Sequence, residues 1–406
     1  MAPPPTPQLE AKFGLPAQVR FCARCVISNQ RPSSTVEYEH TSESKKETIH
    51  FDADGVCDAC RFAEWKDARA DWAERERELR DLLARHRRTD GGYDVLVPGS
   101  GGKDSVYASH ILKYKYGMNP LTVTWAPHIY TEVGWRNFQS WLHAGFDNFL
   151  CTPNGRVHRT LTRLAFENLL HPFQPFIFGQ KSLAPKMAAI HDIPLVIYGE
   201  NEVEYGNPVA EAASAQRDPR YYTQQQRLED LYLGGVRVPE LAQHGVTAKD
   251  LAPYLPADPN VLAEKKIEVH YLGYYLKWVP QECYYYAVEH AGFEANTERT
   301  EGTYSKYNSI DDRMDGFHYY TTFIKCGLGR ATYDAAQEIR NHHLTREEGV
   351  ALVHRFDGEF PRKYFKENLE YMGLAEAQFT EVVDRFRSPH LWKREGDAWV
   401  LRHRVS

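Results

Sequence analysis

The stretch VLVPGSGGKDSVYASHIL, residues 95–112, joins an apolar run to a run of helix-forming residues through a loop of small side chains. The pattern predicts a strand over Asp94–Val97 and a helix over Ser105–Tyr116. Between them, Gly101 and Gly102 let backbone N–H groups approach an anion closely, and the start of the helix adds positive potential. We therefore expect a phosphate-binding loop after this strand.

Two common phosphate motifs do not fit the loop. A Walker motif needs glycine where Val97 stands and Ser or Thr where Asp104 stands, and the dinucleotide fingerprint needs glycine at Asp104. The pattern that remains is a strand followed by the loop Ser-Gly-Gly-x-Asp-Ser and then by a helix. In such a loop Ser100 and Ser105 can donate to phosphate oxygens, Lys103 can neutralise charge, and Asp104 can hold Mg²⁺ or orient the loop.

After this stretch, further short apolar runs alternate with helical stretches. The pattern predicts strands at 121–125, 148–151 and 194–198, and helices at 135–143 and 156–170. Apolar strands separated by helices indicate a parallel sheet covered on both faces. We therefore expect an α/β fold with a doubly wound parallel sheet that binds ligands at the carboxyl ends of its strands.

A chain of 406 residues is long enough for more than one domain. The segment 268–290 is crowded with aromatic residues, which fits either a buried layer or a wall that faces substrate. We expect five parts: a disordered tail at 1–20, a cysteine module at 21–61, one linking helix at 62–90, the α/β domain at 91–335 and a helical region at 336–406. Within the α/β domain, residues 207–262 or so are expected to be an insertion and not a core element.

Composition narrows the classes of protein. The formal charge of −6 argues against nonspecific binding to nucleic acid. No apolar run approaches the ~20 residues needed to cross a membrane, and the beginning MAPPPTPQ lacks the features of a secretory signal. We expect a cytoplasmic protein without a membrane partner.

Four of the seven cysteines form two C-x-x-C pairs, Cys22/Cys25 and Cys57/Cys60. Four thiolates from two such turns can complete a tetrahedral zinc site, which we expect to be structural because it leaves no open position. A redox pair and an iron–sulfur cluster are the alternatives. The isolated Cys151, Cys283 and Cys326 are expected to be small buried side chains.

Two later segments carry polar chemistry. The stretch IYGENEVEYG, residues 197–206, follows an apolar strand and so places Gly199, Glu200 and Asn201 at the carboxyl edge of the sheet, where they suit Mg²⁺ or substrate. The segment 300–348 is dense in polar residues. We expect Asp311 and Asp312 to hold a metal, Lys325 and Arg330 to meet polyphosphate, and Asp315 and His318 to be candidate acid–base groups.

The loop PGSGGKDS resembles the pyrophosphate-binding loop of the N-type ATP pyrophosphatases, or PP-loop family. That family includes argininosuccinate synthetase, asparagine synthetase, GMP synthetase and tRNA thiolases. The resemblance implies that residues 91–335 bind ATP and cleave it between the α- and β-phosphates. The loop would hold pyrophosphate while AMP is attached to a substrate oxygen. By analogy of position, the backbone at Thr124 would contact adenine.

The stretches CARC, FDADGVCDAC, YGEN, GFHYY and GLGRATYDAAQEIRNHHLTREEG together resemble the N-acetyl sugar amidotransferase branch of that family. Members act in O-antigen synthesis and in making acetamidino derivatives of pseudaminic or legionaminic acid, including for flagellin glycosylation. The resemblance implies that ATP, with Mg²⁺, adenylylates an acetamido oxygen and that ammonia then displaces AMP. The implied ATP, metal or sugar ligands are Ser100–Ser105, Glu200, Asn201, Asp311, Asp312, Lys325 and Arg330, with Lys103, Asp104 and Lys325 as catalytic residues.

We expect ammonia to come from a separate glutaminase. The chain has neither an N-terminal cysteine nor a Gly-x-Cys-x-Gly turn. The family reading therefore implies a separate glutaminase partner that resembles the glutaminase subunit of imidazole-glycerol-phosphate synthase, with or without its barrel-like companion.

Two other functions compete with this one. A tRNA thiolase of the PP-loop family would need catalytic cysteines, and here Cys151 and Cys326 are unpaired in sequence. A zinc-ribbon adaptor would need no catalysis, and the intact Lys103 and Asp104 argue against it.

Overall fold

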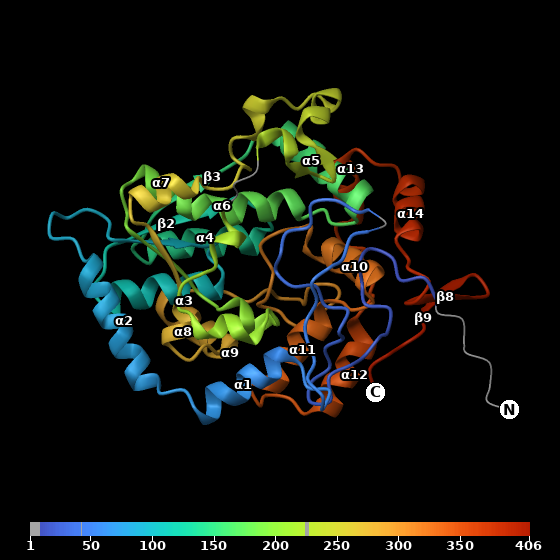
Figure 1. Cartoon of the computed structure of the whole chain (residues 1–406), viewed down its shortest axis with the longest axis horizontal. Coiled ribbons are helices and arrows are strands. Elements are labelled where there is room, and N and C mark those ends of the chain that lie inside the picture. Colours follow the sequence, from blue (N-terminus) through green and yellow to red (C-terminus); the bar gives the residue numbers. More distant parts are fainter. Residues whose placement is uncertain (1–8, 42, 224–226) are drawn as a thin grey trace.

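The computed structural model describes residues 9–41, 43–223 and 227–406. At its centre lies a parallel five-stranded sheet in the order β3-β2-β1-β4-β7 (Figure 1). The strands are β1 (Val95–Pro98), β2 (Pro120–Trp125), β3 (Asp147–Cys151), β4 (Leu195–Tyr198) and β7 (Glu268–Tyr271). The α/β class and the four strands predicted at 94–97, 121–125, 148–151 and 194–198 are confirmed.

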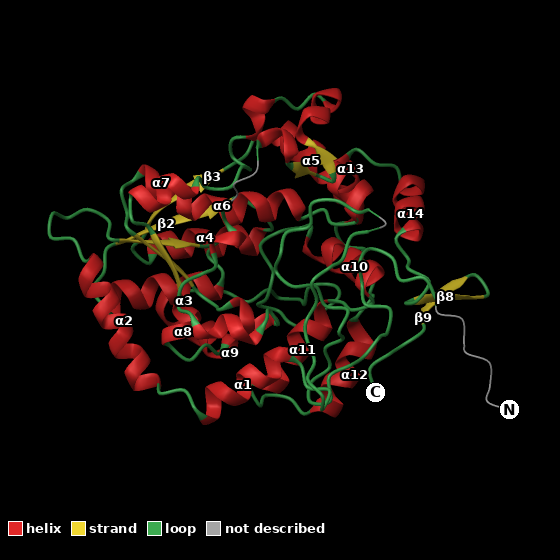
Figure 2. Ribbon diagram, viewed as in Figure 1, coloured by secondary structure: helices red, strands yellow, loops and turns green. Residues whose placement is uncertain are grey.

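Helices cover both faces of the sheet (Figure 2). Side chains alternate along a strand, so Val95 and Val97 face one layer and Leu96 faces the other. The Val95 layer contains α2 (Trp72–His86), α3 (Lys103–His110), α8 (Leu272–Tyr275) and α9 (Pro280–Ala291), and the Leu96 layer contains α5 (Gly155–Leu169) and α6 (Gln174–Ile190). Burial on both faces explains why these strands are continuous apolar runs.

The remaining elements lie around this core. A π-helix over Ile111–Lys115 extends α3, and α4 (Glu132–His143) packs beside α3 and α9. The other helices are α1 (Asp58–Ala68), α7 (Pro259–Glu264), α10 (Asp315–Cys326), α11 (Arg330–Arg340), α12 (Arg346–Phe356), α13 (Phe365–Met372) and α14 (Glu376–Arg385). The predicted helices at 135–143 and 156–170 correspond to α4 and α5.

The order of the strands reverses beside β1. The chain steps from β1 to β2 and β3 on one side and then returns to place β4 on the other side. The loops that follow β1 and β4 therefore separate at their carboxyl ends and leave a crevice, which is where open α/β sheets bind ligands.

The linking helix predicted at 62–90 is instead two helices, α1 and α2. The break comes at Asp71, whose carboxylate accepts a hydrogen bond from Glu74 N at 3.0 Å and caps α2. A capping aspartate can begin a new helix without a glycine or proline to mark the boundary.

The insertion predicted at 207–262 lies between β4 and β7, but it is part of the core. Leu241, Leu251 and Tyr254 are fully buried against α5 and α6, although the segment consists mainly of short 3-10 turns, α7 and the hairpin β5 (Tyr232–Leu233) to β6 (Val236–Arg237). The aromatic stretch 268–290 contains β7, α8 and α9, and Tyr271, Tyr275 and Trp278 form a buried layer there.

The N-terminal segment packs against the C-terminal region. Of the tail predicted at 1–20, residues 1–8 lie outside the described residues, whereas Leu15 is buried beside α14 and His390 N donates to the Glu10 carbonyl at 3.3 Å. Residues 336–406 are mainly helical as predicted, with an added hairpin of β8 (Trp392–Glu395) and β9 (Ala398–Leu401). The predicted boundary at 335 falls inside α11. Within the described ranges, no helix is long and apolar enough to span a membrane.

A buried ion pair ties α1 to the sheet. Lys66 Nζ lies 2.6 and 2.7 Å from the two carboxylate oxygens of Glu204, which sits in a 3-10 helix, Glu202–Tyr205, shortly after β4. Both side chains are almost completely buried. Removing one partner of such a pair leaves an uncompensated charge in the interior.

We predict that Lys66→Met lowers the free energy of unfolding by about 3–5 kcal/mol, because it leaves the Glu204 carboxylate unpaired. The double variant Lys66→Met/Glu204→Leu should recover most of this loss. Urea unfolding of the three proteins measures both values. A double variant as unstable as Lys66→Met would contradict the ion-pair explanation.

Candidate functional site

The loop after β1 is held close to α4. Gly101 has a φ of +84°, and a Cβ on it would lie 2.7 Å from Phe138 Cα. Gly99 N donates to the Val123 carbonyl at 2.9 Å, which continues the β1–β2 pairing into the loop. The close approach to α4 and the positive φ both require glycine at 101.

Lys103 and Asp104 form a charged pair at the start of α3. Lys103 Nζ lies 2.5 Å from Asp104 Oδ2, and only 6% of Lys103 is exposed. Although burial opposes it, the Asp104 carboxylate raises the pKa of Lys103. The second carboxylate oxygen, Asp104 Oδ1, is buried and accepts no hydrogen bond from the described residues. The Ser105 hydroxyl donates to the Gly102 carbonyl at 2.9 Å and so stabilises the turn.

Glu200 follows β4 and lies beside this pair. Burial and the Asp104 carboxylate raise the pKa of Glu200 to about 7, with Lys103 opposing the shift. Neighbouring Gly199 packs against the Trp278 ring, where a Cβ would lie 2.8 Å from the indole. Asn201 Oδ1 caps the next 3-10 helix by accepting from Val203 N at 3.0 Å. The loops after β1 and β4 thus place two carboxylates and one ammonium group near one another.

Asp311 and Asp312 have different surroundings. Asp311 lies beside Ser100 of the loop, and burial raises the pKa of Asp311 while the Ser100 side chain opposes the rise. The Asp312 carboxylate accepts from His128 N at 2.7 Å, His128 Nδ1 at 2.8 Å and Met314 N at 3.0 Å. Asp312 is therefore occupied in joining the loop after β2 to α10.

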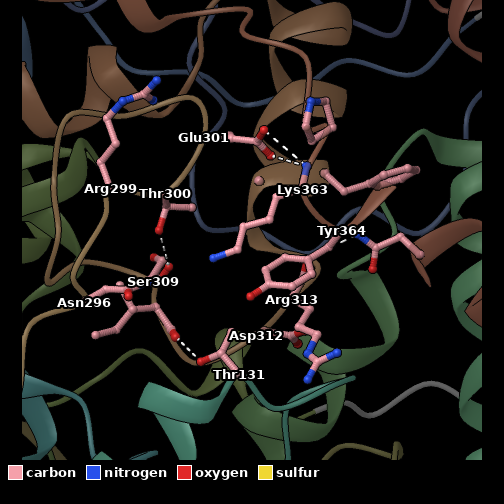
Figure 3. A pocket seen from close by; sticks show the side chains of 15 residues that line it. Thr131, Asn296, Arg299, Thr300, Glu301, Ser309, Asp312, Arg313, Lys363 and Tyr364 are labelled. Atoms are coloured by element: carbon pink, nitrogen blue, oxygen red, sulfur yellow. Dashed lines mark hydrogen bonds between the residues drawn. The ribbon is translucent and has the colours of Figure 1, made fainter. Parts of the chain in front are cut away.

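Figure 3 shows a small pocket that Asp312 also lines, with a volume of about 40 Å³. Its cationic side chains already have carboxylate partners: Arg299 with Glu359, Arg313 with Glu367, and Lys363 with Glu298. Small-molecule sites usually measure about 300–1,000 Å³. This pocket is too small and too well neutralised to receive a polyphosphate.

A larger cavity, of about 350 Å³, lies between the N-terminal segment and the α10–α11 region. Arg330, at the start of α11, reaches it and is paired with Asp334 at 2.9 Å; despite burial, Asp334 raises the pKa of Arg330. Its lining residues are Arg31, Pro32, Ser33, Ser34, Thr35, Glu37, Lys46, Leu170, His171, Ile177, Tyr205, His318, Tyr319, Thr322, Lys325, Cys326, Arg330, Tyr333, Asp334 and Gln337.

Tyr205 connects this cavity to the loop. It lines the cavity, and burial together with the nearby Glu200 and Asp104 carboxylates raises its pKa well above the usual range. Arg330 in turn lies near Tyr205. The cavity therefore adjoins the two carboxylates.

Several buried polar atoms on the cavity wall have no hydrogen-bond partner among the described residues. They are Gln337 Nε2, Tyr319 Oη and His318 Nδ1. Burial lowers the pKa of His318 to about 3, so its ring is neutral near pH 7. The cavity wall thus combines charged, hydroxyl and amide side chains, which suits a polar ligand.

Lys325, which is distant in sequence from the loop after β1, lines the cavity. Its Nζ lies 2.6 Å from Glu37 Oε2 and 2.5 Å from the Leu169 carbonyl. Burial lowers the pKa of Lys325 to about 8, against the opposing charge of Glu37. Lys325 is paired with Glu37 in this structure. Its contact with polyphosphate stays a prediction.

Thr124 lies inside the sheet. Its hydroxyl accepts from Asn148 Nδ2 at 3.0 Å, so the side chain joins β2 to β3, and only its backbone is left for the predicted adenine contact. Sequence reasoning missed Tyr205, Gln337 and Arg31, because their side chains reach the cavity only through tertiary packing.

The four cysteines of the N-terminal module converge. Cys22 Sγ lies 3.9 Å from Cys60 Sγ, Cys25 Sγ lies 3.8 Å from Cys57 Sγ, and all four sulfurs lie within 4.8 Å of one another. Sulfurs arranged tetrahedrally about 2.3 Å from one ion would be about 3.8 Å apart. The cluster is thus suited to bind a single metal ion.

Comparisons with known proteins give partial matches. Residues 301–405 match the family described as "LPS biosynthesis protein WbpG-like, C-terminal domain". An uncharacterized protein of Methanocaldococcus jannaschii is 32% identical over 85 residues, which are 21% of this chain and 29% of that protein. The match therefore spans less than a third of that relative's length.

Two solved structures are also similar to part of the chain. The NH3-dependent NAD synthetase of Campylobacter jejuni has 16% identity and a TM-score of 0.27, covering 48% of this chain and 93% of the synthetase. The U34-tRNA thiolase NcsA of Methanococcus maripaludis, solved with its [4Fe-4S] cluster, has 13% identity and a TM-score of 0.29, covering 76% and 87%. At these TM-scores we infer no function from either enzyme.

We predict that Gly101→Ala is more destabilising than Gly91→Ala. Both glycines have a positive φ, +84° and +81°, but only the Cβ at 101 would collide with α4, whereas nothing lies within 4 Å at 91. Gly91→Ala should cost about 1 kcal/mol of unfolding free energy, and Gly101→Ala clearly more. Thermal and urea unfolding compare them; equal losses would show that the approach to α4 is unimportant.

Proposed function

We propose that the chain is an ATP-dependent amidotransferase that converts an N-acetyl group of a bacterial surface sugar to an acetamidino group. One observation carries the proposal. The Ser-Gly-Gly-Lys-Asp-Ser loop lies where the strand order reverses, and it adjoins a polar cavity with unpaired donors and acceptors. The arrangement suits a nucleotide and a polar acceptor side by side.

The match to a lipopolysaccharide-biosynthesis domain supports a sugar as the acceptor. The matched residues, 301–405, supply one wall of the cavity, including Tyr319, Arg330, Asp334 and Gln337. A volume of about 350 Å³ is within the range of small-ligand sites. Amide and phenol groups without partners are the groups that bind sugar hydroxyls.

The proposed reaction has two displacements. The acetamido oxygen attacks the α-phosphorus of ATP, the bond to the β-phosphate oxygen breaks, and pyrophosphate leaves. Ammonia then attacks the imidate carbon, the C–O bond breaks, and AMP leaves with the former acetamido oxygen. The amide nitrogen stays on the sugar, so the product is an acetamidine.

In this scheme each part of the loop has a task. Backbone N–H groups at Gly101 and Gly102, with the Lys103 ammonium, bind the departing pyrophosphate. Arg330, which lines the same cavity as Tyr205, extends the positive charge toward the acceptor side. These groups stabilise negative charge that develops on the phosphates as the bond breaks.

The residues present fit both expected metals. Asp104, with its unpaired Oδ1, and Glu200 would hold Mg²⁺, which neutralises phosphate charge and lowers the barrier to attack. The four cysteine sulfurs lie at the spacing of a one-ion site, which favours structural Zn²⁺; the ligands of a cubane cluster bind separate iron atoms and lie farther apart.

Ammonia is mostly protonated near pH 7, so a source that delivers it unprotonated would help the second displacement. We infer a separate glutaminase as the partner in the cell. Free ammonium at high concentration and pH should replace it in vitro.

We predict that the chain releases AMP and pyrophosphate in equal amounts only when ATP, ammonium and an N-acetylated sugar are all present. Lys103→Ala should lower turnover about 10²- to 10³-fold, because a charge that stabilises the leaving pyrophosphate is lost. Lys115→Ala, at an exposed lysine just beyond α3, is the matched control and should keep full activity. Coupled assays for AMP and pyrophosphate measure both rates.

The outcomes separate the alternatives. ADP as product would exclude the pyrophosphatase reaction altogether. AMP release that needs tRNA and sulfide instead of sugar and ammonium would support a thiolase. Circular dichroism of Lys103→Ala checks that the loss does not come from unfolding.

A second prediction concerns pH. Glu200 must lose its proton to hold Mg²⁺, and its pKa is raised to about 7. The Mg²⁺ concentration for half-maximal AMP release should therefore fall as pH rises from about 6 to about 8. Glu200→Gln should raise the Mg²⁺ concentration needed for half-maximal AMP release and should remove its dependence on pH. Glu289→Gln, at an exposed position, should leave that pH dependence unchanged. An equal slope in Glu200→Gln would assign the titration to another group.

A further inference from the structure

Residues 29–41 and 43–48, which lie between the two cysteine pairs, form a wall of the large cavity. In the structure Arg31, Ser33, Thr35, Glu37 and Lys46 from this segment all line the cavity. Figure 1 shows the N-terminal segment, in blue, running beside α10 and α11. We call residues 29–48 the inter-pair segment.

Both ends of the inter-pair segment are fixed next to the cysteine cluster. Ile49 N donates to the Arg31 carbonyl at 2.9 Å, and Ser33 N donates to the Glu47 carbonyl at 2.8 Å, so the two ends run side by side. Cys57 N lies 3.4 Å from Cys22 Sγ and joins the two cysteine pairs. Ile49, which directly follows the segment, is buried in one apolar cluster with the four cysteines, so the base of the cavity wall packs against the cysteine cluster.

The middle of the segment is fixed by Glu37. Its carboxylate lies 2.6 Å from Lys325 Nζ, 2.6 Å from Lys46 Nζ and 2.9 Å from His40 Nε2. Although burial opposes it, the two ammonium groups hold the pKa of Glu37 well below its usual range. The Glu37 carbonyl also accepts from Gln174 Nε2 of α6 at 3.0 Å. Glu37 thus joins the wall to α10 and α6.

Arg31 differs from the other cations of the cavity. Lys46, Lys325 and Arg330 each have a carboxylate partner, whereas Arg31 has none among the described residues. Arg31 is only 8% exposed, and its one side-chain hydrogen bond runs from Nη1 to the Pro32 carbonyl at 2.8 Å.

The guanidinium lies over the Tyr333 ring, 5.2 Å from its centroid, and burial lowers the pKa of Arg31. A nearly buried guanidinium costs free energy unless oxygen atoms accept its hydrogens. Gln337 and Tyr319, with unpaired polar atoms, line the same cavity. Arg31 therefore leaves guanidinium hydrogens for the oxygen atoms of a polar ligand.

We propose that the inter-pair segment is the acceptor-binding element of the site, with Arg31 as the residue that donates to oxygen atoms of the acceptor and Glu37 as the residue that positions the segment. The inference rests on the proposed function for the identity of the acceptor as an N-acetyl sugar. It assigns to the cysteine module a share in substrate binding in addition to its part in the fold.

Arg31→Met tests the contact. Losing a charged hydrogen bond to the acceptor should raise the acceptor KM about 10- to 100-fold, while the KM for ATP changes less than about twofold. Arg31→Lys should recover part of the loss. Arg24→Met, at an exposed arginine of the same module, is the control and should leave both constants unchanged. An unchanged acceptor KM in Arg31→Met would overturn the assignment.

Glu37→Gln tests the positioning. It should raise the acceptor KM and speed proteolytic cleavage within residues 31–48, because the tie to Lys325 is weakened. Glu37→Asp should restore part of both, and Glu43→Gln, exposed on the same segment, should change neither. A raised KM without faster cleavage would contradict a positioning role.

Direct binding keeps this inference separate from the proposed reaction. N-acetylglucosamine, UDP-N-acetylglucosamine and N-acetylneuraminic acid are titrated calorimetrically into the wild-type chain and Arg31→Met, with a non-hydrolysable ATP analogue present. If a probe binds the wild-type chain and binds Arg31→Met more weakly, the cavity assignment is supported. This holds even if no AMP is ever released and the proposed reaction fails. AMP release with equal binding by both proteins overturns the assignment and leaves the reaction standing. No binding of any probe by the wild-type chain also counts against the assignment.

Discussion

Two carboxylates, Asp104 and Glu200, lie near each other at the place where the strand order reverses, and the candidate site depends on this arrangement. Desolvation and the charge of Asp104 raise the pKa of Glu200, and Lys103 offsets only part of the rise. The arrangement exists because parallel strands end at the same edge and the loops after β1 and β4 separate there. Gly101 completes it, since only a residue without Cβ lets the loop lie against α4. Such a space favours a cation together with the phosphates that it neutralises.

The acceptor side is assembled from parts of the chain that are distant in sequence. Lys325 and Glu37 are 288 residues apart, yet they are in contact and both line the cavity. Tyr205, from the loop after β4, also lines it and lies near the two carboxylates. The cysteine cluster packs against the base of the wall that Arg31 and Glu37 occupy. One consequence is that the cysteine cluster can help to determine the shape of the cavity although it lies outside it.

The features that could be predicted from the sequence are those with a local cause. Short apolar runs, the Ser-Gly-Gly-Lys-Asp-Ser loop and the spacing of the cysteine pairs each specify their own structure, and β1–β4, α3 and the four-sulfur cluster follow. Strand β7, the break at Asp71 and the buried insertion were missed because neighbouring elements, and not local periodicity, decide them. Arg31 and Glu37 carry no local signal at all. For Asp312 there was a local signal, because two adjacent carboxylates predicted a metal site. In the structure, His128 and backbone N–H groups donate to the Asp312 oxygens instead.

In the proposed function, ATP activates the acetamido oxygen of a sugar, and the most direct measurement follows that oxygen. An N-acetylated sugar labelled with ¹⁸O in its acetyl carbonyl is turned over with ATP and ammonium, and the AMP is analysed by mass spectrometry. We predict one ¹⁸O atom in the phosphate of AMP for each acetamidino group formed. Unlabelled AMP, with the label retained in the sugar or released to water, would contradict it.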